Sequence, residues 1–421
     1  MEAVVAGVIF LVTYGLIATE RVDKTVAALL GGSLVVILGI IDQEEAFGAI
    51  DLNVIFLLAG MMILAGILRR TGFFQWVAIR SVKVARGEPF RLLLVLSTVC
   101  ALLSALLDNV TTVVLIAPVT LYIANVLRVS PLPFLISEIL ASNIGGSATL
   151  IGDPPNILIG SAADLGFDDF LVHMAPAAFL VYVAFLGMTY WFYGRDLAVD
   201  PATRDSVLGL DEREVLTDPA LLRLSLGVIA VTVVGFLLAK PLGLEAGTIA
   251  LLGASALMLL SRSEAEEVLQ EVEWSTLFFF VGLFMLVEAV VHVGIVGAVA
   301  DGLIDLTGAE PVVTTLGLIW LSGIASAVID NIPYTAAMIP VVQDLGAAGI
   351  PIEPLWWALA LGACLGGNAT IVGASANVVV ANLAGRADHP ITFGQFLRYG
   401  LPVTFVSLAI STGYVFIRYL A

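Results

Sequence analysis

The sequence predicts an all-α polytopic membrane protein made of two inverted-topology repeats, and three observations lead to this fold class. The 421 residues are 60% hydrophobic and only 13% charged, a composition typical of chains with many membrane-spanning helices. Motifs of the first half recur in the second half at a nearly constant spacing. Basic residues are distributed unequally between matched loops.

Long apolar runs predict the spanning helices. They lie at residues 4–18, 26–41, 54–68, 170–193, 221–239, 247–260, 274–291, 311–329 and 396–420. The first run has no basic flank before it and no small-residue cleavage site after it, which favours a spanning helix over a signal peptide. The net charge of −17 makes nucleic acid an unlikely partner. Cys100 and Cys364 are predicted to be small buried apolar residues.

An internal repeat organises the chain. Asp108-Asn109 recurs 222 positions later as Asp330-Asn331, and Gly60 recurs at the same spacing as Gly282. The stretch 144–156, IGGSATLIGDPPN, recurs 221 positions later as LGGNATIVGASAN. We therefore expect one repeat at residues 1–193, a charged linker at 194–219, and a second repeat at 220–421.

The charge of matched loops predicts that the repeats are inverted. Residues 69–91 carry six basic side chains, and the matched residues 291–313 carry none. The basic residues are Arg69, Arg70, Arg80, Lys83, Arg86 and Arg91. Under the positive-inside rule the first loop is cytoplasmic and the second is outside. Inverted repeats that meet at the membrane midplane are common in secondary transporters.

Two segments of each repeat have the wrong length for a simple span. Residues 91–128 would form a helix of roughly 55 Å, whereas the hydrocarbon layer is about 30 Å thick, so we expect a re-entrant hairpin that turns near Asp108. Residues 133–163 are interrupted by Gly-Asp-Pro-Pro-Asn at 152–156, which predicts a broken helix. The second repeat has its hairpin at about 312–345 and its broken helix at about 354–382. Each repeat then crosses the membrane about five times.

Polar residues beside these breaks are the candidate site. Asp108, Asp153 and Asp330 are ionisable residues at predicted membrane depth, where such groups usually serve function. The amide and hydroxyl residues beside them are Asn109, Asn156, Asn331, Asn377, Thr111, Thr149 and Thr370. An ordinary role as helix caps is the competing interpretation of the aspartates. Glu288, which replaces Gly66 of the other repeat, is either a proton site or the partner of another polar group.

The motifs LDNVTTVVLIAPVT, SNIGGSATLIGDPPN, VIDNIPYTAAMIP and GGNATIVGASAN resemble those of ArsB/NhaD-type permeases of the ion transporter superfamily, in particular arsenite-permease-like and P protein-like members. The resemblance covers nearly the whole chain. It implies a homodimer with scaffold and transport domains and an elevator-type movement. Carried over by motif, it places the substrate at Asp108, Asn109, Asn143, Thr149, Asp153, Asn156, Asp330, Asn331, Asn368 and Asn377. The tips read Asp-Asn-Val and Asp-Asn-Ile, unlike the Ser-Asn-Thr of the dicarboxylate branch.

These observations predict an ion-coupled secondary transporter, not an enzyme, in a bacterial or archaeal plasma membrane. Up to three acids at the site repel dianions, which favours a cation, a proton-coupled neutral solute, or an anion carried only when the acids are neutralised. The family resemblance then implies proton-coupled export of a small inorganic solute such as arsenite or antimonite. Sodium–proton antiport is the alternative, with Na⁺ at Asp108 and Asp330, and an anion carrier or a passive channel follows. The coupling ion is H⁺ or Na⁺, and no other cofactor is expected. An ATPase subunit is a candidate partner, because some arsenite permeases have one and this chain has no P-loop. An intramembrane aspartyl protease is disfavoured, since Leu150-Ile151 precede Gly152-Asp153 where that class has Gly-x.

Overall fold

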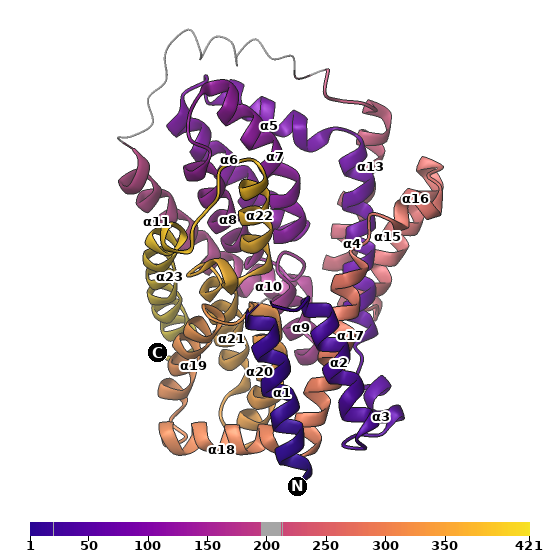
Figure 1. The fold of residues 1–421 in the computed structure, drawn as a ribbon, viewed down its shortest axis with the longest axis vertical. Coiled ribbons are helices and arrows are strands. Elements are labelled where there is room, and N and C mark those ends of the chain that lie inside the picture. Colours follow the sequence, from indigo (N-terminus) through magenta and orange to yellow (C-terminus); the bar gives the residue numbers. More distant parts are fainter. Residues whose placement is uncertain (20, 195–211, 213) are drawn as a thin grey trace.

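The computed structural model describes residues 1–19, 21–194, 212 and 214–421. In this part of the chain, helices joined by turns and short loops form the structure (Figure 1). Most of the predicted linker, 195–211 and 213, lies outside these described residues. In the first half the helices are α1 (Glu2–Thr19), α2 (Lys24–Ile37), α3 (Gln43–Gly48), α4 (Leu52–Arg70), α5 (Phe73–Val84), α6 (Pro89–Ser104), α7 (Asn109–Leu127), α8 (Leu132–Gly146), α9 (Pro154–Ala163), α10 (Phe167–His173) and α11 (Ala175–Tyr193).

The second half follows the same order of long and short helices. These are α13 (Pro219–Leu237), α14 (Ala239–Leu242), α15 (Ala246–Ser261), α16 (Ala265–Leu269), α17 (Trp274–His292), α18 (Ile295–Thr307), α19 (Pro311–Ser326), α20 (Asn331–Ala347), α21 (Ile352–Gly366), the 3₁₀ turn η1 (Ile371–Gly373), α22 (Ser375–Arg386), α23 (Phe393–Val415) and the terminal π-turn η2 (Phe416–Leu420). Aspartate side chains accept backbone N–H groups at the first turns of several helices, which explains where these helices begin. These aspartates are Asp23, Asp42, Asp51, Asp108, Asp218 and Asp330.

Seven helices in the described part are long and apolar enough to cross a membrane, namely α1, α4, α7, α11, α13, α17 and the last helix, 393–420. This is fewer than about five crossings for each half. The difference lies in α2, α8, α15 and α21, which are apolar but only 14 to 16 residues long. A helix of 15 residues is about 22 Å long and spans the layer only with a continuation such as α9 or α22. The α7 arm of the first hairpin has 19 residues and is long enough to span by itself.

Matched glycines join the two halves in the part of the molecule that we call the scaffold, α1, α2, α4, α13, α15 and α17. A Cβ at Gly282 of α17 would lie 2.5 Å from the backbone of Ala28 in α2. A Cβ at Gly60 of α4 would lie 2.7 Å from the backbone of Ala250 in α15. Each half therefore contributes one helix to each of two close crossings, which only residues without a side chain allow.

The hairpins and broken helices form a second unit, which we call the transport unit: α6–α9 and α19–α22. Close backbone contacts at glycine again set the spacing. A Cβ at Gly145 of α8 would lie 2.1 Å from the Ala101 carbonyl of α6, and one at Gly366 of α21 would lie 2.5 Å from the Gly323 carbonyl of α19. Each hairpin is thereby packed against the broken helix of its own half.

The amphipathic helices α5 and α18 lie at opposite ends of the molecule (Figure 1). Both begin at a glycine in the left-handed region, Gly72 with φ 78° and Gly294 with φ 76°, where other residues would be strained. Near α5, the Glu212 carboxylate pairs with Arg80 at 3.1 Å and with Lys83 at 3.5 Å. The basic surface and the end of the linker are therefore at the same end of the molecule.

This placement yields a test of orientation. Arg80 on α5 and Asp301 on α18 are both exposed, so a single cysteine at either position is reachable by a membrane-impermeant thiol reagent. We expect Arg80→Cys to be labelled only from the cytoplasmic side and Asp301→Cys only from the outside, because only the first loop is basic. Labelling of both cysteines from one side would rule out inverted repeats.

Candidate functional site

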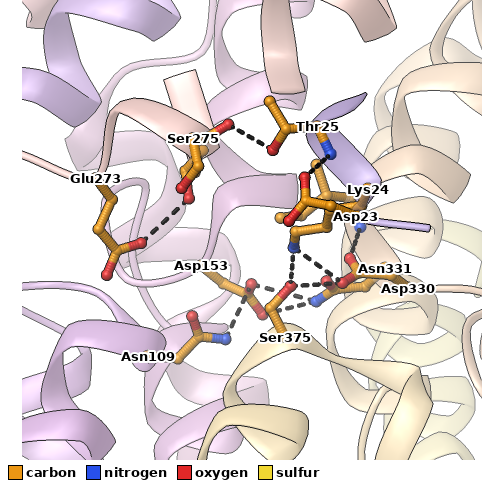
Figure 2. A network of polar contacts seen from close by, with 12 residues as sticks. Asp23, Lys24, Thr25, Asn109, Asp153, Glu273, Ser275, Asp330, Asn331 and Ser375 are labelled. Atoms are coloured by element: carbon orange, nitrogen blue, oxygen red, sulfur yellow. Dashed lines mark hydrogen bonds and ion pairs between the residues drawn. The ribbon is translucent and has the colours of Figure 1, made fainter. Parts of the chain in front are cut away.

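The two hairpin tips converge on one buried carboxylate, that of Asp153. Asn109, the first residue of α7, donates its Nδ2–H to Asp153 Oδ1 at 3.2 Å. Asn331, the first residue of α20, donates to the same oxygen at 3.2 Å and lies 3.4 Å from Oδ2. Figure 2 shows Asn109 and Asn331 on either side of the aspartate. Asp153 is fully buried, so an ionised carboxylate here depends on these amides and on any cation or proton that reaches it.

The local sequence leaves this carboxylate available. Asp153 stands at the N-cap of α9 but makes no side-chain capping bond. Pro154 and Pro155 occupy the first helical positions, and proline has no N–H to donate. The Asp153 side chain is thus free to face the tips, and capping does not account for it.

Asp108 and Asp330, in contrast, do cap helices. Asp108 Oδ1 accepts the Thr111 N–H at 2.8 Å, and Asp330 Oδ1 accepts the Ile332 N–H at 3.0 Å. Each bond uses one carboxylate oxygen, which leaves the second oxygen for another partner. The capping and binding interpretations are therefore compatible at these two positions.

Amide groups extend the site across the two halves. Asn143 of α8 donates to Asn368 Oδ1 and to Asn377 Oδ1, both at 2.9 Å. Its own Oδ1 accepts from Asn109 at 3.1 Å. The site residues that the structure brings together in this buried network are Asn109, Asn143, Asp153, Asn331, Asn368 and Asn377.

Four residues predicted to bind substrate also hold the breaks in shape. Asn156 Nδ2 donates to the Thr149 carbonyl and Asn377 Nδ2 to the Thr370 carbonyl, both at 2.8 Å. The Thr149 hydroxyl donates to the Ala105 carbonyl and the Thr370 hydroxyl to the Ala327 carbonyl, both at 2.6 Å. The carbonyls at the end of the first arm of each hairpin have no partner within their own helix. The two threonine hydroxyls donate to these carbonyls and so connect each break to its hairpin tip.

Lys24 of the scaffold helix α2, which no sequence motif indicated, contacts the second hairpin tip. Its Nζ donates to Ser375 Oγ at 2.6 Å and lies 3.6 Å from Asp330 Oδ2. Ser375 in turn donates to Asp330 Oδ2 at 2.5 Å (Figure 2). A cavity of about 270 Å³ opens onto this triad and is lined otherwise mostly by apolar side chains of α1 and α22. The position matched to Lys24 is Ala246, so the repeat carried no signal for it; a lysine at the start of an apolar helix is the one clue.

The first tip has a different setting. Thr111 lines a small cavity of about 50 Å³ beside α4 and α17, together with Arg69, Glu271 and Glu273. Arg69 forms an ion pair with Glu271 there. The described residues around Asp108 include no lysine or arginine bonded to its carboxylate, so the two tips differ in charge.

Glu288 lies apart from this site. It stands one turn before the end of α17, and the charged groups that act on it are Glu45 and His292. His292 Nδ1 and Glu45 Oε1 are 2.6 Å apart. The structure therefore places Glu288 on the side of α17 that meets α3, away from the hairpin tips. Glu288 has no hydrogen bond or ion pair among the described residues, so both hypotheses, a proton site and a hidden polar partner, stay predictions.

Comparison with known proteins identifies the family. The sequence model of the family described as citrate transporter matches residues 14–362. This chain belongs to that transporter family. It is 46% identical over 425 residues to a protein described as an uncharacterized transporter of Mycobacterium tuberculosis, with 99% of each chain covered. It is 34% identical to the human P protein, over 99% of this chain and 59% of that protein. The predicted family resemblance is confirmed.

Solved structures show the same fold. The YdaH transporter of Alcanivorax borkumensis matches with a TM-score of 0.64 over 99% of this chain and 98% of its own, at 15% identity. MtrF of Neisseria gonorrhoeae matches with a TM-score of 0.61 over 92% of this chain and 84% of its own, at 15% identity. The chain is thus a multi-pass secondary transporter of the citrate transporter family.

The bonds at the breaks lead to a stability prediction. Thr149→Val and Thr370→Val each leave a half-buried carbonyl without its donor, and we expect a loss of about 0.5–1.5 kcal/mol in either variant. Thermal unfolding of purified protein measures this loss. Thr19→Val is the control, because the Thr19 hydroxyl is exposed and bonds only within its own helix. Two variants as stable as wild type would show that the hydroxyls are free for substrate.

Proposed function

We propose that the protein couples the movement of a small solute to protons, or to a cation that takes their place, bound at Asp153 and at the two tip aspartates. The observation that carries the proposal is the buried Asp153 carboxylate, bonded to Asn109 of one tip and Asn331 of the other. A single group in contact with both hairpins changes the interactions of both when it gains or loses a proton. Coupling through charge at such depth is the usual role of ionisable intramembrane residues.

Matched hydrogen bonds support two inverted repeats. Ser104 donates to the Ser142 carbonyl and Ser326 to the Ala363 carbonyl, both at 2.7 Å. The breaks are closed by matched bonds as well, and α5 and α18 lie at opposite ends (Figure 1). Rocking or sliding of one unit about a fixed site is the movement that such repeats allow.

An elevator-type movement of the transport unit against the scaffold fits the contacts between them. The Tyr14 hydroxyl of α1 donates to the Pro333 carbonyl at 2.8 Å. Lys24 bonds Ser375 and faces Asp330, and its helix start is fastened to the scaffold because Thr25 Oγ1 donates to the Ser275 carbonyl at 2.9 Å. We infer that the Lys24 ammonium holds the second tip until a proton or cation neutralises Asp330.

Proton-coupled export of arsenite or antimonite is the substrate assignment that we favour. The site combines several amides with three carboxylates and a single lysine. A neutral hydroxylated solute can bond amides as donor and acceptor without repulsion from Asp108, Asp153 and Asp330. A citrate trianion would meet that repulsion, so we assign carboxylate transport a lower rank even though the family carries its name.

Sodium–proton antiport is the second candidate, and the Lys24 contact favours it. The ammonium already occupies a place beside a carboxylate and a hydroxyl, oxygen groups that also suit a small cation. Sodium at Asp330 would then displace Lys24.

We also infer a homodimer built on the scaffold and an inner-membrane location, both from the family resemblance. The proposed ion coupling means that no ATPase subunit is required.

The tip aspartates give a prediction about coupling. Asparagine caps a helix about as well as aspartate, so Asp108→Asn and Asp330→Asn should fold and insert normally. We expect each to reduce pH-driven arsenite flux in proteoliposomes at least about tenfold, because the titratable group is gone. Glu288→Gln is the control and should keep its flux, since Glu288 lies away from the hairpin tips. Normal flux in the double Asp108→Asn, Asp330→Asn variant would refute the assignment.

Replacement of Lys24 tests the contact between the units. Lys24→Met keeps the length of the side chain and removes the ammonium, so Asp330 loses its only basic partner among the described residues. Without the ammonium, the second hairpin tip should leave its present position more often. We therefore expect faster labelling of a cysteine placed at Val379, which lines the cavity beside Lys24. Lys24→Arg, which preserves the charge, should label like wild type. Equal labelling of Lys24→Met and wild type would show that the lysine does not hold the tip.

A further inference from the structure

A second buried carboxyl lies on the broken helix of the first half, facing the first hairpin and away from the site described above. Glu138 of α8 is 1% exposed, and its Oε1 accepts the Thr120 hydroxyl of α7 at 2.6 Å. Its Oε2 has no partner among the described residues. Ser97 of α6 is also fully buried with an unpartnered hydroxyl in the described part of the chain. Nothing in the proposed coupling at Asp153 uses these groups.

The second half of the molecule shows that the fold does not need them. At the spacing of the repeat, Ser97, Thr120 and Glu138 match three apolar residues. These are Ile319, Val342 and Leu359. All three are fully buried between α19, α20 and α21. The same layer of helices is therefore packed with hydrocarbon in one half and with polar groups in the other, and replacing buried polar groups by hydrocarbon is commonly neutral or stabilising. A costly carboxyl that packing does not require points to function.

The surroundings of Glu138 suit a group that holds a proton. The neighbouring helix α6 carries the buried Cys100, and α7 presents Thr120. Apolar side chains separate the pocket from the basic ends of the hairpin at Arg91 and Arg128. They are Leu93, Leu96, Ile123, Leu127 and Phe134. An ionised carboxylate in such a place would lack both water and a cation, whereas a neutral carboxylic acid carries no charge and costs far less to bury.

The same helix continues to the central site. Ser142 follows Glu138 by one turn on α8, and its hydroxyl donates to the Asn109 carbonyl at 3.1 Å. Asn109 is the tip residue that also bonds Asp153. A change in the packing of α8 at Glu138 is therefore transmitted through one turn of helix to the first hairpin tip.

We propose that Glu138 is a second proton-binding site of this transporter, occupied in the state seen here and emptied during the cycle. The proton resides on Oε2, while Oε1 accepts from Thr120. When α6, α7 and α8 separate enough to admit water, the carboxyl releases the proton to that water and becomes a carboxylate; the reverse step reloads it. The inference rests on the proposed proton coupling and adds a site that only the first repeat has.

Infrared spectroscopy of the purified protein in lipid tests this directly and requires no substrate. A protonated carboxyl has a C=O band that ionisation removes. We expect wild type to show such a band, to lose part of it as pH rises, and Glu138→Gln to lack that part. Asp153→Asn should retain it, which separates this site from the central one. A Glu138 band that stays constant across the stable pH range, or a spectrum unchanged by Glu138→Gln, would overturn the proposal.

A second variant distinguishes proton binding from packing. Thr120→Val combined with Glu138→Leu copies Val342 and Leu359 of the second half, so it should fold with at least wild-type thermal stability. We expect this double variant to retain arsenite binding and to lose the pH dependence that Glu138 contributes to arsenite flux. A pH profile identical to that of wild type would show a structural acid only. If wild type shows no pH-driven arsenite flux, the proposed function is refuted. The infrared experiment would still test proton binding at Glu138, because it requires no substrate.

Discussion

The structure depends on the cost of burying one carboxylate where two hairpins meet. Asp153 is fully buried, yet its side chain makes no capping bond, because Pro154 and Pro155 have no N–H and the Asn156 N–H donates to the Asp153 carbonyl. Its partners must come from elsewhere, and they come from Asn109 and Asn331 at the two tips. A buried charge without partners would strongly destabilise the site. The hairpin tips, the helix breaks and the close glycine contacts together position the two amides next to the carboxylate.

The two halves share a frame and differ in chemistry. Their matched bonds at the breaks have the same lengths, so the frame is built twice. The groups that carry charge occur once: Asp153 matches Ala374, Lys24 matches Ala246, and Glu138 matches Leu359. In the proposed mechanism, a symmetric frame allows movement between two mirrored states, and the unmatched charged groups bind the coupling ion. The duplicated Asp-Asn pairs belong to both categories, since they cap helices and face the shared site.

Much of this was predictable from the sequence, for stated physical reasons. Proline lacks an N–H donor and glycine lacks a side chain, so interruptions near 152–156 and 373–377 could be predicted. The structure has the breaks slightly earlier, at 147–153 and 367–374. Side-chain bonds could not be predicted from the sequence: the Thr149 and Thr370 hydroxyls donate to carbonyls at the hairpin tips, and no sequence pattern indicates these bonds. Lys24 and Glu138 were missed because a repeat reveals what the halves share, and these residues lack a counterpart.

Proton movement coupled to a solute gradient tests most directly whether the Asp153 carboxylate carries the coupling. Proteoliposomes that contain a pH-sensitive dye are given an outward gradient of arsenite, then of antimonite and of sodium, without an imposed pH gradient. We predict that wild type moves protons against at least one of these gradients, and that Asp153→Asn abolishes this proton movement while the amide still bonds the tips. Proton movement by Asp153→Asn at the wild-type rate would contradict the central role of the shared carboxylate.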